Sequence, residues 1–132
     1  MSFTGNFACN SLKTGFNDRT INFATDTFYL ALYTNNATLD ASTAVYTPVG
    51  EATGGNYAPG GQIVTAITGS SFVNFSSPSW TGVITARGAL IYKFGSNVAI
   101  CVLDFGSDKT SVTTYTVQMP ATGSTSSLIR FV

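Results

Sequence analysis

The feature that most constrains the fold is a succession of short β-type runs separated by turn-forming residues. Apolar, β-branched and aromatic residues recur in short stretches, and glycine, serine, asparagine or proline stands between them. Such stretches are typical of antiparallel strands joined by tight turns. From residue 61 onward the predicted strands are GQIVTAIT, SFVNFSS, a region around TGVITA, RGALIYKF, NVAICVLDFG, VTTYTVQMP and SLIRFV. About eight such strands predict an all-β fold, an antiparallel β-sandwich of jelly-roll type.

Two of the runs also predict which faces are buried. In FYLALY, residues 28–33, apolar side chains occupy both alternating sets, so both faces of this strand are expected to be covered. Residues 112–119 predict a strand with one buried side. The predicted core face carries Thr113, Tyr115, Val117 and Met119, and the wetter face carries Val112, Thr114, Thr116 and Gln118.

The N-terminal half of the chain is less regular. Apolar residues recur at a loosely helical spacing in the N-terminal segment, residues 1–20, at Phe3, Phe7, Leu12 and Phe16. This spacing predicts one short helix, from Asn6 to Thr14. Two strands, TINFAT and DTFYLALYT, are expected next. Residues 35–61 then lose any period and are rich in glycine, which predicts a long interface loop, with VYTPV as an edge strand.

Length and charge bear on the surroundings of such a protein. A chain of 132 residues is near the commonest domain size and predicts a single domain, residues 1–132. Only 9% of its residues are charged and its formal net charge is +0 at pH 7. Two explanations stay open: other subunits cover much of the surface, or the surface is neutral and rich in hydroxyl groups. The basic residues are scattered singly and predict no nucleic-acid binding, and no apolar run is long enough to cross a membrane.

The stretch ARGALIYKFGSNVAICVLDFG, residues 86–106, predicts a β-hairpin around a Gly-Ser-Asn turn. Asp104 is expected to end the second strand and Gly106 to open a loop. Arg87 and Lys93 are placed near the ends of the first strand, where their charged groups reach water. The DFG triplet also occurs in protein kinases, but the chain lacks their glycine loop and HRD motif. The hairpin is therefore interpreted as structural.

Few residues offer catalytic or metal-binding chemistry. The chain has no histidine, which excludes Ser-His-Asp and Cys-His catalysis and histidine metal sites. Its two cysteines, Cys9 and Cys101, are too few for a Cys-only zinc site and are expected to stay reduced. Two alternatives stay open: a pair of carboxylates acting as a glycosidase, and a calcium loop around Asp104 and Asp108. The prediction is a protein that is not an enzyme and has no cofactor and no metal.

A sugar-binding platform is a further alternative, because aromatic rings stack against glycans. The candidate rings are Trp80, Tyr29, Tyr33, Tyr46 and Tyr57. The competing interpretation places Trp80, in SPSWTG, at the end of the hydrophobic core, and it is the preferred one.

Three segments of the chain resemble a family of small structural proteins of tailed bacteriophages: NSLKTGFNDRTINFATDTFYLALYT, NYAPGGQIV and WTGVITARGALIYKFGSNVAICVLDFGSDKTS. The resemblance extends from Asn10 to Ile129 and carries no catalytic motif. It implies a β-sandwich displayed in many copies on the virion. Within that class it implies a capsid cement or decoration protein, a homotrimer at the capsid surface that bridges and stabilises major capsid subunits. It also implies synthesis in the cytoplasm of the bacterial host.

The partners expected from this resemblance are the major capsid protein and other copies of the chain, without nucleic acid or membrane. Contacts are expected on Phe3 and Phe7 of the N-terminal segment. Tyr46 and Tyr57 of the long loop are expected to join them, because both elements are the least committed to the sheet. Trp80 completes the predicted set of interface residues. Two alternatives stay open: a neck, tail or spike module of the virion, and a receptor- or glycan-binding sandwich.

Overall fold

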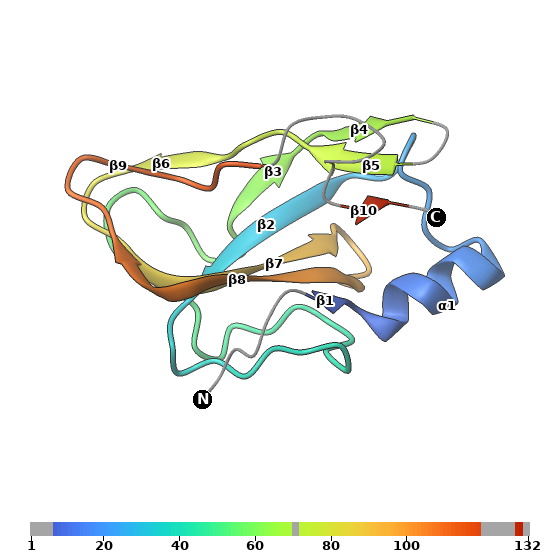
Figure 1. Ribbon diagram of the computed structural model, residues 1–132, viewed down its shortest axis with the longest axis horizontal. Coiled ribbons are helices and arrows are strands. Elements are labelled where there is room, and N and C mark those ends of the chain that lie inside the picture. The colour runs from blue at the N-terminus through green and yellow to red at the C-terminus, as the bar shows by residue number, and fades with distance from the viewer. Residues whose placement is uncertain (1–6, 70–71, 120–128, 131–132) are drawn as a thin grey trace.

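The computed structural model describes residues 7–69, 72–119 and 129–130 (Figure 1). Within them the fold is mostly β, with antiparallel sheets and one short helix, so the predicted fold class is confirmed. The elements in chain order are β1 (Phe7–Ala8), α1 (Asn10–Asp18), β2 (Phe28–Tyr33), β3 (Gln62–Val64), β4 (Ala66–Thr68), β5 (Phe72–Phe75), β6 (Ser79–Thr81), β7 (Thr85–Lys93), β8 (Ala99–Thr110), β9 (Thr114–Thr116) and β10 (Ile129–Arg130).

The largest sheet has the strand order β1-β8-β7-β2-β3, and every pairing in it is antiparallel. Neighbouring cross-strand pairs of β2 and β7 point to opposite faces. The pair Leu30–Ile91 belongs to one core cluster, and Ala31 with Leu90 belongs to another. Both faces of residues 28–33 are therefore covered, as predicted, and the large sheet needs a layer on each side.

The first of these layers consists of two smaller sheets, β10-β5-β4 and β6-β9. Figure 1 shows β4, β5, β6 and β9 lying above the large sheet. Phe28 of the large sheet shares one core cluster with Phe75 of β5, Trp80 of β6 and Tyr115 of β9. The arrangement is sandwich-like. The strand pairings do not establish a jelly-roll connectivity, which stays a prediction.

The second layer is formed by residues 35–61, here called the cover segment. The segment leaves the end of β2 and reaches the start of β8 at the Val45–Val98 bridge, then returns to β2 at the Glu51–Tyr33 bridge. Ala37, Leu39 and Tyr46 of the segment form a second core cluster with side chains of β2, β7 and β8. Ala52 and Tyr57, near the end of the segment, pack against the first cluster instead. The predicted absence of regular structure is confirmed. The predicted edge strand at residues 45–49 is reduced to the bridge at Val45, because the proline of VYTPV cannot donate to a ladder.

The segments β6–β7 and β8–β9 form one bent two-stranded ribbon, which passes from the large sheet into the layer above it (Figure 1). The hydrogen-bond ladder continues through the bend. Ser111 N–H donates to the Ile84 carbonyl at 2.9 Å, and Gly82 N–H donates to the Thr113 carbonyl at 2.8 Å. The two sheets are therefore joined by one ribbon, whose ladder is continuous through the bend and is broken by register shifts only further along β7 and β8.

The predicted end of the second hairpin strand is wrong. β8 continues to Thr110, so Asp104 lies inside the strand and not at its end. The pairing of β7 with β8 shifts register between Ala86 and Gly88. Gly106, in the stretch of β8 opposite this shift, adopts a φ of 86°. A bulge with a glycine of positive φ bends a strand without ending it, and the local sequence alone does not distinguish it from a turn.

The N-terminal helix begins later than predicted, at Asn10 and not at Asn6. Residues 7–8 instead form β1, because their backbone pairs with β8. The helix runs past the predicted end at Thr14 as far as Asp18. It stops at Arg19, whose left-handed φ of 64° allows its N–H to donate to the Gly15 carbonyl. A backbone partner far away in the sequence thus displaced the helix start.

Residues 20–25 form a turn, and the strand predicted there is wrong. Asn22 N–H donates to Asp26 Oδ2 at 2.7 Å, and Asp26 N–H donates to the Asn22 carbonyl at 2.8 Å. Local side-chain hydrogen bonds of this kind compete with strand pairing. The alternation predicted for residues 112–119 is confirmed for Tyr115 and Val117, which are buried. Thr113 is exposed, because it lies in the connection between β8 and β9.

Candidate interaction surface

Two of the predicted interface residues, Tyr46 and Tyr57, bind the same carboxylate. Tyr46 OH donates to Glu51 Oε1 at 2.6 Å, and Tyr57 OH donates to Glu51 Oε2 at 2.5 Å. Gly60 N–H adds a third donor to Oε2 at 2.7 Å. Glu51 is the only glutamate of the chain. All four residues belong to the cover segment, so one partly buried carboxylate holds its loops together.

Further hydrogen bonds attach this cluster to the large sheet. Leu32 N–H donates to the Tyr57 hydroxyl oxygen at 2.9 Å, and Tyr92 OH donates to the Gly60 carbonyl at 2.6 Å. Tyr33 OH donates to the Thr47 carbonyl at 2.6 Å. The expectation that the long loop is poorly committed to the sheet is therefore wrong. The reason is that tyrosine hydroxyls from both sides satisfy polar groups that the contact buries.

The same surroundings keep the tyrosine hydroxyls protonated. Burial, followed by the hydrogen bond to Glu51, raises the pKa of Tyr57 and of Tyr46 far above the ordinary value. Burial and the charge of Glu51 also raise the pKa of Tyr92 to about 12. The three hydroxyls act as hydrogen-bond donors at neutral pH, which suits a structural contact and not proton transfer.

The remaining predicted interface residues lie elsewhere. Trp80 is 2% exposed and its ring lies 5.5 Å from that of Tyr57, so it belongs to the core, which was the preferred interpretation. Tyr33 is also fully buried, at 0% exposure. Two of the five rings considered for a sugar-binding platform, Trp80 and Tyr33, are therefore too buried to stack against a glycan. Phe7 lies in β1, paired with Val102, and Phe3 lies outside the described residues.

A row of adjoining aromatic rings runs along the face of the large sheet that the cover segment protects. The ring centroids of Tyr46 and Tyr92 are 4.8 Å apart, those of Tyr92 and Tyr29 are 6.2 Å apart, and those of Tyr29 and Phe94 are 4.8 Å apart. Tyr29 lies directly opposite Tyr92 in the ladder, so the two side chains share one face. The row begins under the cover segment at Tyr46 and ends outside it at Phe94.

The uncovered end of this row is the candidate interaction surface. Phe94 is 55% exposed, although it stacks on Tyr29. Ile63 of β3, directly across the ladder from Tyr29, is also 55% exposed. We call Tyr29, Ile63 and Phe94 together the Phe94 patch. Exposed apolar groups that adjoin one another mark interaction sites more often than scattered ones do. The sequence interpretation missed Ile63 and Phe94, because neither the turn KFGSN nor the run GQIVTAIT tells where the cover ends.

Two cations of β7, Lys93 beside the Phe94 patch and Arg87 near the other end of the strand, are paired with carboxylates within the fold. Lys93 Nζ lies 3.4 Å from Asp26 Oδ2 and donates to the Thr20 carbonyl at 2.7 Å. Arg87 Nε lies 3.0 Å from Asp104 Oδ1, and both side chains are 12% exposed. The expectation that Arg87 simply reaches water is therefore wrong. Burial opposes ionisation of Asp104, but the Gly106 N–H and Arg87 outweigh it and hold its pKa below the ordinary value.

Among the described residues, most of the acids are held in local hydrogen bonds and ion pairs, and they do not gather with the thiols into a metal site. Asp18 and Asp40 accept hydrogen bonds from Thr20 and Ser42, two residues along the chain. No group of three or more Cys, Asp or Glu side chains within residues 7–69, 72–119 and 129–130 is placed to hold a metal ion. Asp104 pairs with Arg87, and both acids of DFGSDK lie in β8 and not in a loop.

The two cysteines are buried and carry free thiols, as expected. Burial, with a smaller contribution from Asp40, raises the pKa of the Cys9 thiol to about 12. A thiol of this kind is a poor nucleophile at neutral pH, because only the thiolate reacts. Cys9 and Cys101 therefore act as small core residues.

Helices of membrane-spanning length and hydropathy do not occur in the part of the chain that the structure describes. Comparison of the chain with protein-family models, with curated proteins and with solved structures finds no match in any of the three.

Proposed function

We propose that the chain is a structural component of a bacteriophage virion, a cement or decoration protein that bridges and stabilises major capsid subunits. The observation that carries this proposal is the Phe94 patch, a group of adjoining, exposed apolar side chains at the end of a row of rings that is covered elsewhere. Its partner is a capsid subunit, and the patch is buried when the protein binds. The proposal extends the resemblance to small phage structural proteins found in the sequence.

The low charge of the chain favours such a function. Burying apolar and hydroxyl-bearing side chains against a neighbour costs less desolvation free energy than burying unpaired charges. Only 9% of the residues are charged, and the Arg87–Asp104 and Lys93–Asp26 pairs already compensate two of the cations. Several weak contacts made at once by a homotrimer would give a long residence time on the particle.

The experiment uses phage particles that lack the protein. Purified wild-type protein, the Ile63→Ser/Phe94→Ser double variant and a Val83→Ser control are added to separate samples. Val83 is 60% exposed but lies in the connection between β6 and β7, away from the patch. Bound copies per particle and the temperature of DNA release are then measured.

We expect the wild-type protein and Val83→Ser to bind and to raise the temperature of DNA release, and the double variant to do neither. Binding of on the order of hundreds of copies supports a cement location, whereas about three, six or twelve copies indicate a neck, tail or spike module. Equal DNA release with and without the protein contradicts the stabilising role. Equal binding by the double variant contradicts the role of the Phe94 patch.

A further inference from the structure

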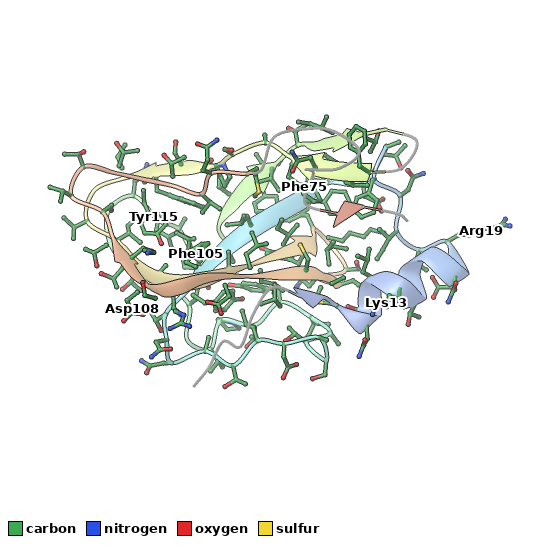
Figure 2. All side chains as sticks on the ribbon, in the orientation of Figure 1. Lys13, Arg19, Phe75, Phe105, Asp108 and Tyr115 are labelled. Atoms are coloured by element: carbon green, nitrogen blue, oxygen red, sulfur yellow. The ribbon has the colours of Figure 1, made fainter. Side chains whose placement is uncertain are left out.

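A groove of about 390 Å³ lies along the bent ribbon, between the distal half of β8 and β9. Phe105 and Lys109 line it from β8, and Tyr115 and Val117 line it from β9 and the residues that follow. None of its lining residues comes from β6 or β7, the inner strands of the ribbon. The groove therefore opens along the outer edge of the ribbon. Figure 2 shows Phe105 and Tyr115 between the two layers at the bend.

The backbone of β9 presents hydrogen-bonding groups to this groove. Within residues 7–69, 72–119 and 129–130, β9 pairs with β6 and with no other strand. Val117 N–H donates to the Pro78 carbonyl, and the Thr113 carbonyl accepts from Gly82 N–H. Odd-numbered residues thus face β6, and in an antiparallel ladder the alternate residues face the other way. The backbone N–H and C=O groups of Thr114 and Thr116 consequently point toward the groove.

The side chains of the groove supply specificity. The Phe105 and Tyr115 rings lie 6.3 Å apart and, with Val117, form an apolar floor. Lys109, at the β8 side, is exposed, and no acidic side chain among the described residues lies within ion-pair distance of it. The neighbouring carboxylate of Asp108 is also exposed, and its charge, after burial, contributes to raising the pKa of Tyr115 in the groove floor. An occupant with a carboxylate beside Lys109 would complement the charge of the lysine.

We propose that this groove binds an extended peptide segment of a partner protein, which adds a third strand to the ribbon beside β9. The backbone of the segment pairs with Thr114 and Thr116, as in recognition by β-strand addition. Alternate apolar side chains of the segment lie over Phe105, Tyr115 and Val117, and one acidic side chain lies beside Lys109. The proposal names a binding mode and stands independently of the Phe94 patch and of the virion function.

The test uses the full chain and blocked seven-residue peptides of alternating valine and threonine that end in glutamate, glutamine or lysine. Binding is followed by amide chemical shifts and by the dissociation constant. Two variants probe the site. Thr116→Pro removes an N–H that faces the groove and spares the ladder to β6, and Lys109→Glu reverses the charge. Each variant is first compared with the wild-type spectrum to check that it is folded.

We expect the glutamate peptide to shift the amides of Thr114, Thr116 and Gln118 and to bind about fivefold more tightly than the glutamine peptide. Thr116→Pro should weaken binding at least about tenfold. Lys109→Glu should reverse the preference, so that the lysine peptide binds more tightly than the glutamate peptide. If Thr116→Pro does not fold, the peptide preference of Lys109→Glu is the deciding measurement. Absence of shifts in β9, shifts confined to another edge, or an unchanged peptide preference in Lys109→Glu would overturn the proposal.

Discussion

Glu51 joins the cover segment into one unit, because three donors converge on its carboxylate. No Lys or Arg takes part in these hydrogen bonds, which come from two tyrosine hydroxyls and one backbone N–H. Leaving a buried donor unsatisfied costs about 1–3 kcal/mol. A single charged residue in a nearly uncharged loop therefore stabilises the contact between that loop and the sheet, and nothing in its neighbouring sequence marks it for this role.

The tyrosines of this cluster predict a loss of stability at alkaline pH. Tyrosines in the unfolded chain lose their protons near pH 10, whereas in the folded protein Tyr57 and Tyr46 keep theirs, because their pKa values are raised. The folded state thus binds more protons, so stability is full below about pH 10 and falls as the pH rises further. Each such tyrosine lowers the free energy of unfolding by about 1.4 kcal/mol per pH unit in that range.

The variant Tyr57→Phe isolates this effect from other titrating groups. Urea unfolding between pH 8 and pH 11.5 measures the free energy of unfolding for both proteins. We expect Tyr57→Phe to be less stable than the wild type at pH 8, because it loses the hydrogen bonds to Glu51 and Leu32. Above pH 10 its free energy of unfolding should fall less steeply than that of the wild type. The difference in slope should be about 1.4 kcal/mol per pH unit, the contribution of one tyrosine. Identical slopes for the two proteins would show that Tyr57 does not titrate on unfolding.

The cover segment shows how an element without regular structure serves as a layer. Its backbone is bridged to Val98 and to Tyr33. Tyrosine hydroxyls add hydrogen bonds to the sheet at Thr47, between the two bridges, and at Tyr57, beyond them. Where it ends, the chain must pass very close to β2 before β3 can pair. Gly61 occupies this position with a φ of 83°, and a Cβ there would collide with the Leu30 carbonyl oxygen. The layer therefore depends on one close backbone approach.

The variant Gly61→Ala tests that dependence, with Gly95→Ala as the matched control. Gly95 also has a positive φ, 98°, but a Cβ there meets nothing within 4 Å. Both variants pay the cost of a left-handed conformation, about 1–2 kcal/mol. Gly61→Ala should lose a further 1–3 kcal/mol, roughly, because the backbone must shift to relieve the collision. Thermal and urea unfolding measure both, and an equal loss in the two variants would contradict the close approach.

The molecule as a whole combines three layers with very few charges. Both faces of the large sheet are covered, the thiols are buried, and 9% of the residues are charged. What remains exposed and apolar is therefore confined to a few places, among them the Phe94 patch. An association that uses such a surface is driven by apolar burial, which salt does not screen.

Binding to particles through the Phe94 patch is expected to depend little on salt. At 0.1 M salt the Debye length is about 10 Å, so contacts between charged surfaces weaken strongly as salt increases. We expect the fraction of protein retained on particles to change less than about twofold between 0.05 and 0.5 M NaCl. Sedimentation of particles with bound protein measures it. A loss of tenfold or more would mean that charged groups dominate the contact.

The composition and periodicity of the sequence determined the antiparallel β class, the burial of residues 28–33 and the irregularity of residues 35–61. These properties depend on local alternation and on turn residues, which a reader of the sequence sees directly. The burial of Trp80 could also be predicted, because a single tryptophan flanked by turn residues is expected at the end of a hydrophobic core. The absence of histidine narrowed the chemistry before any contact was known.

Only the tertiary structure decided what residues 35–61 do, where the helix begins and which apolar side chains stay exposed. Tyr46 and Tyr57 turn inward because Glu51 and Leu32, partners at other points of the chain, satisfy their hydroxyls. Residues 7–8 became a strand because β8 offered a backbone partner far along the chain. Phe94 stays exposed because the cover stops short of it. Each outcome depends on hydrogen bonds or packing between distant segments, and such contacts leave no periodic trace in the residues themselves.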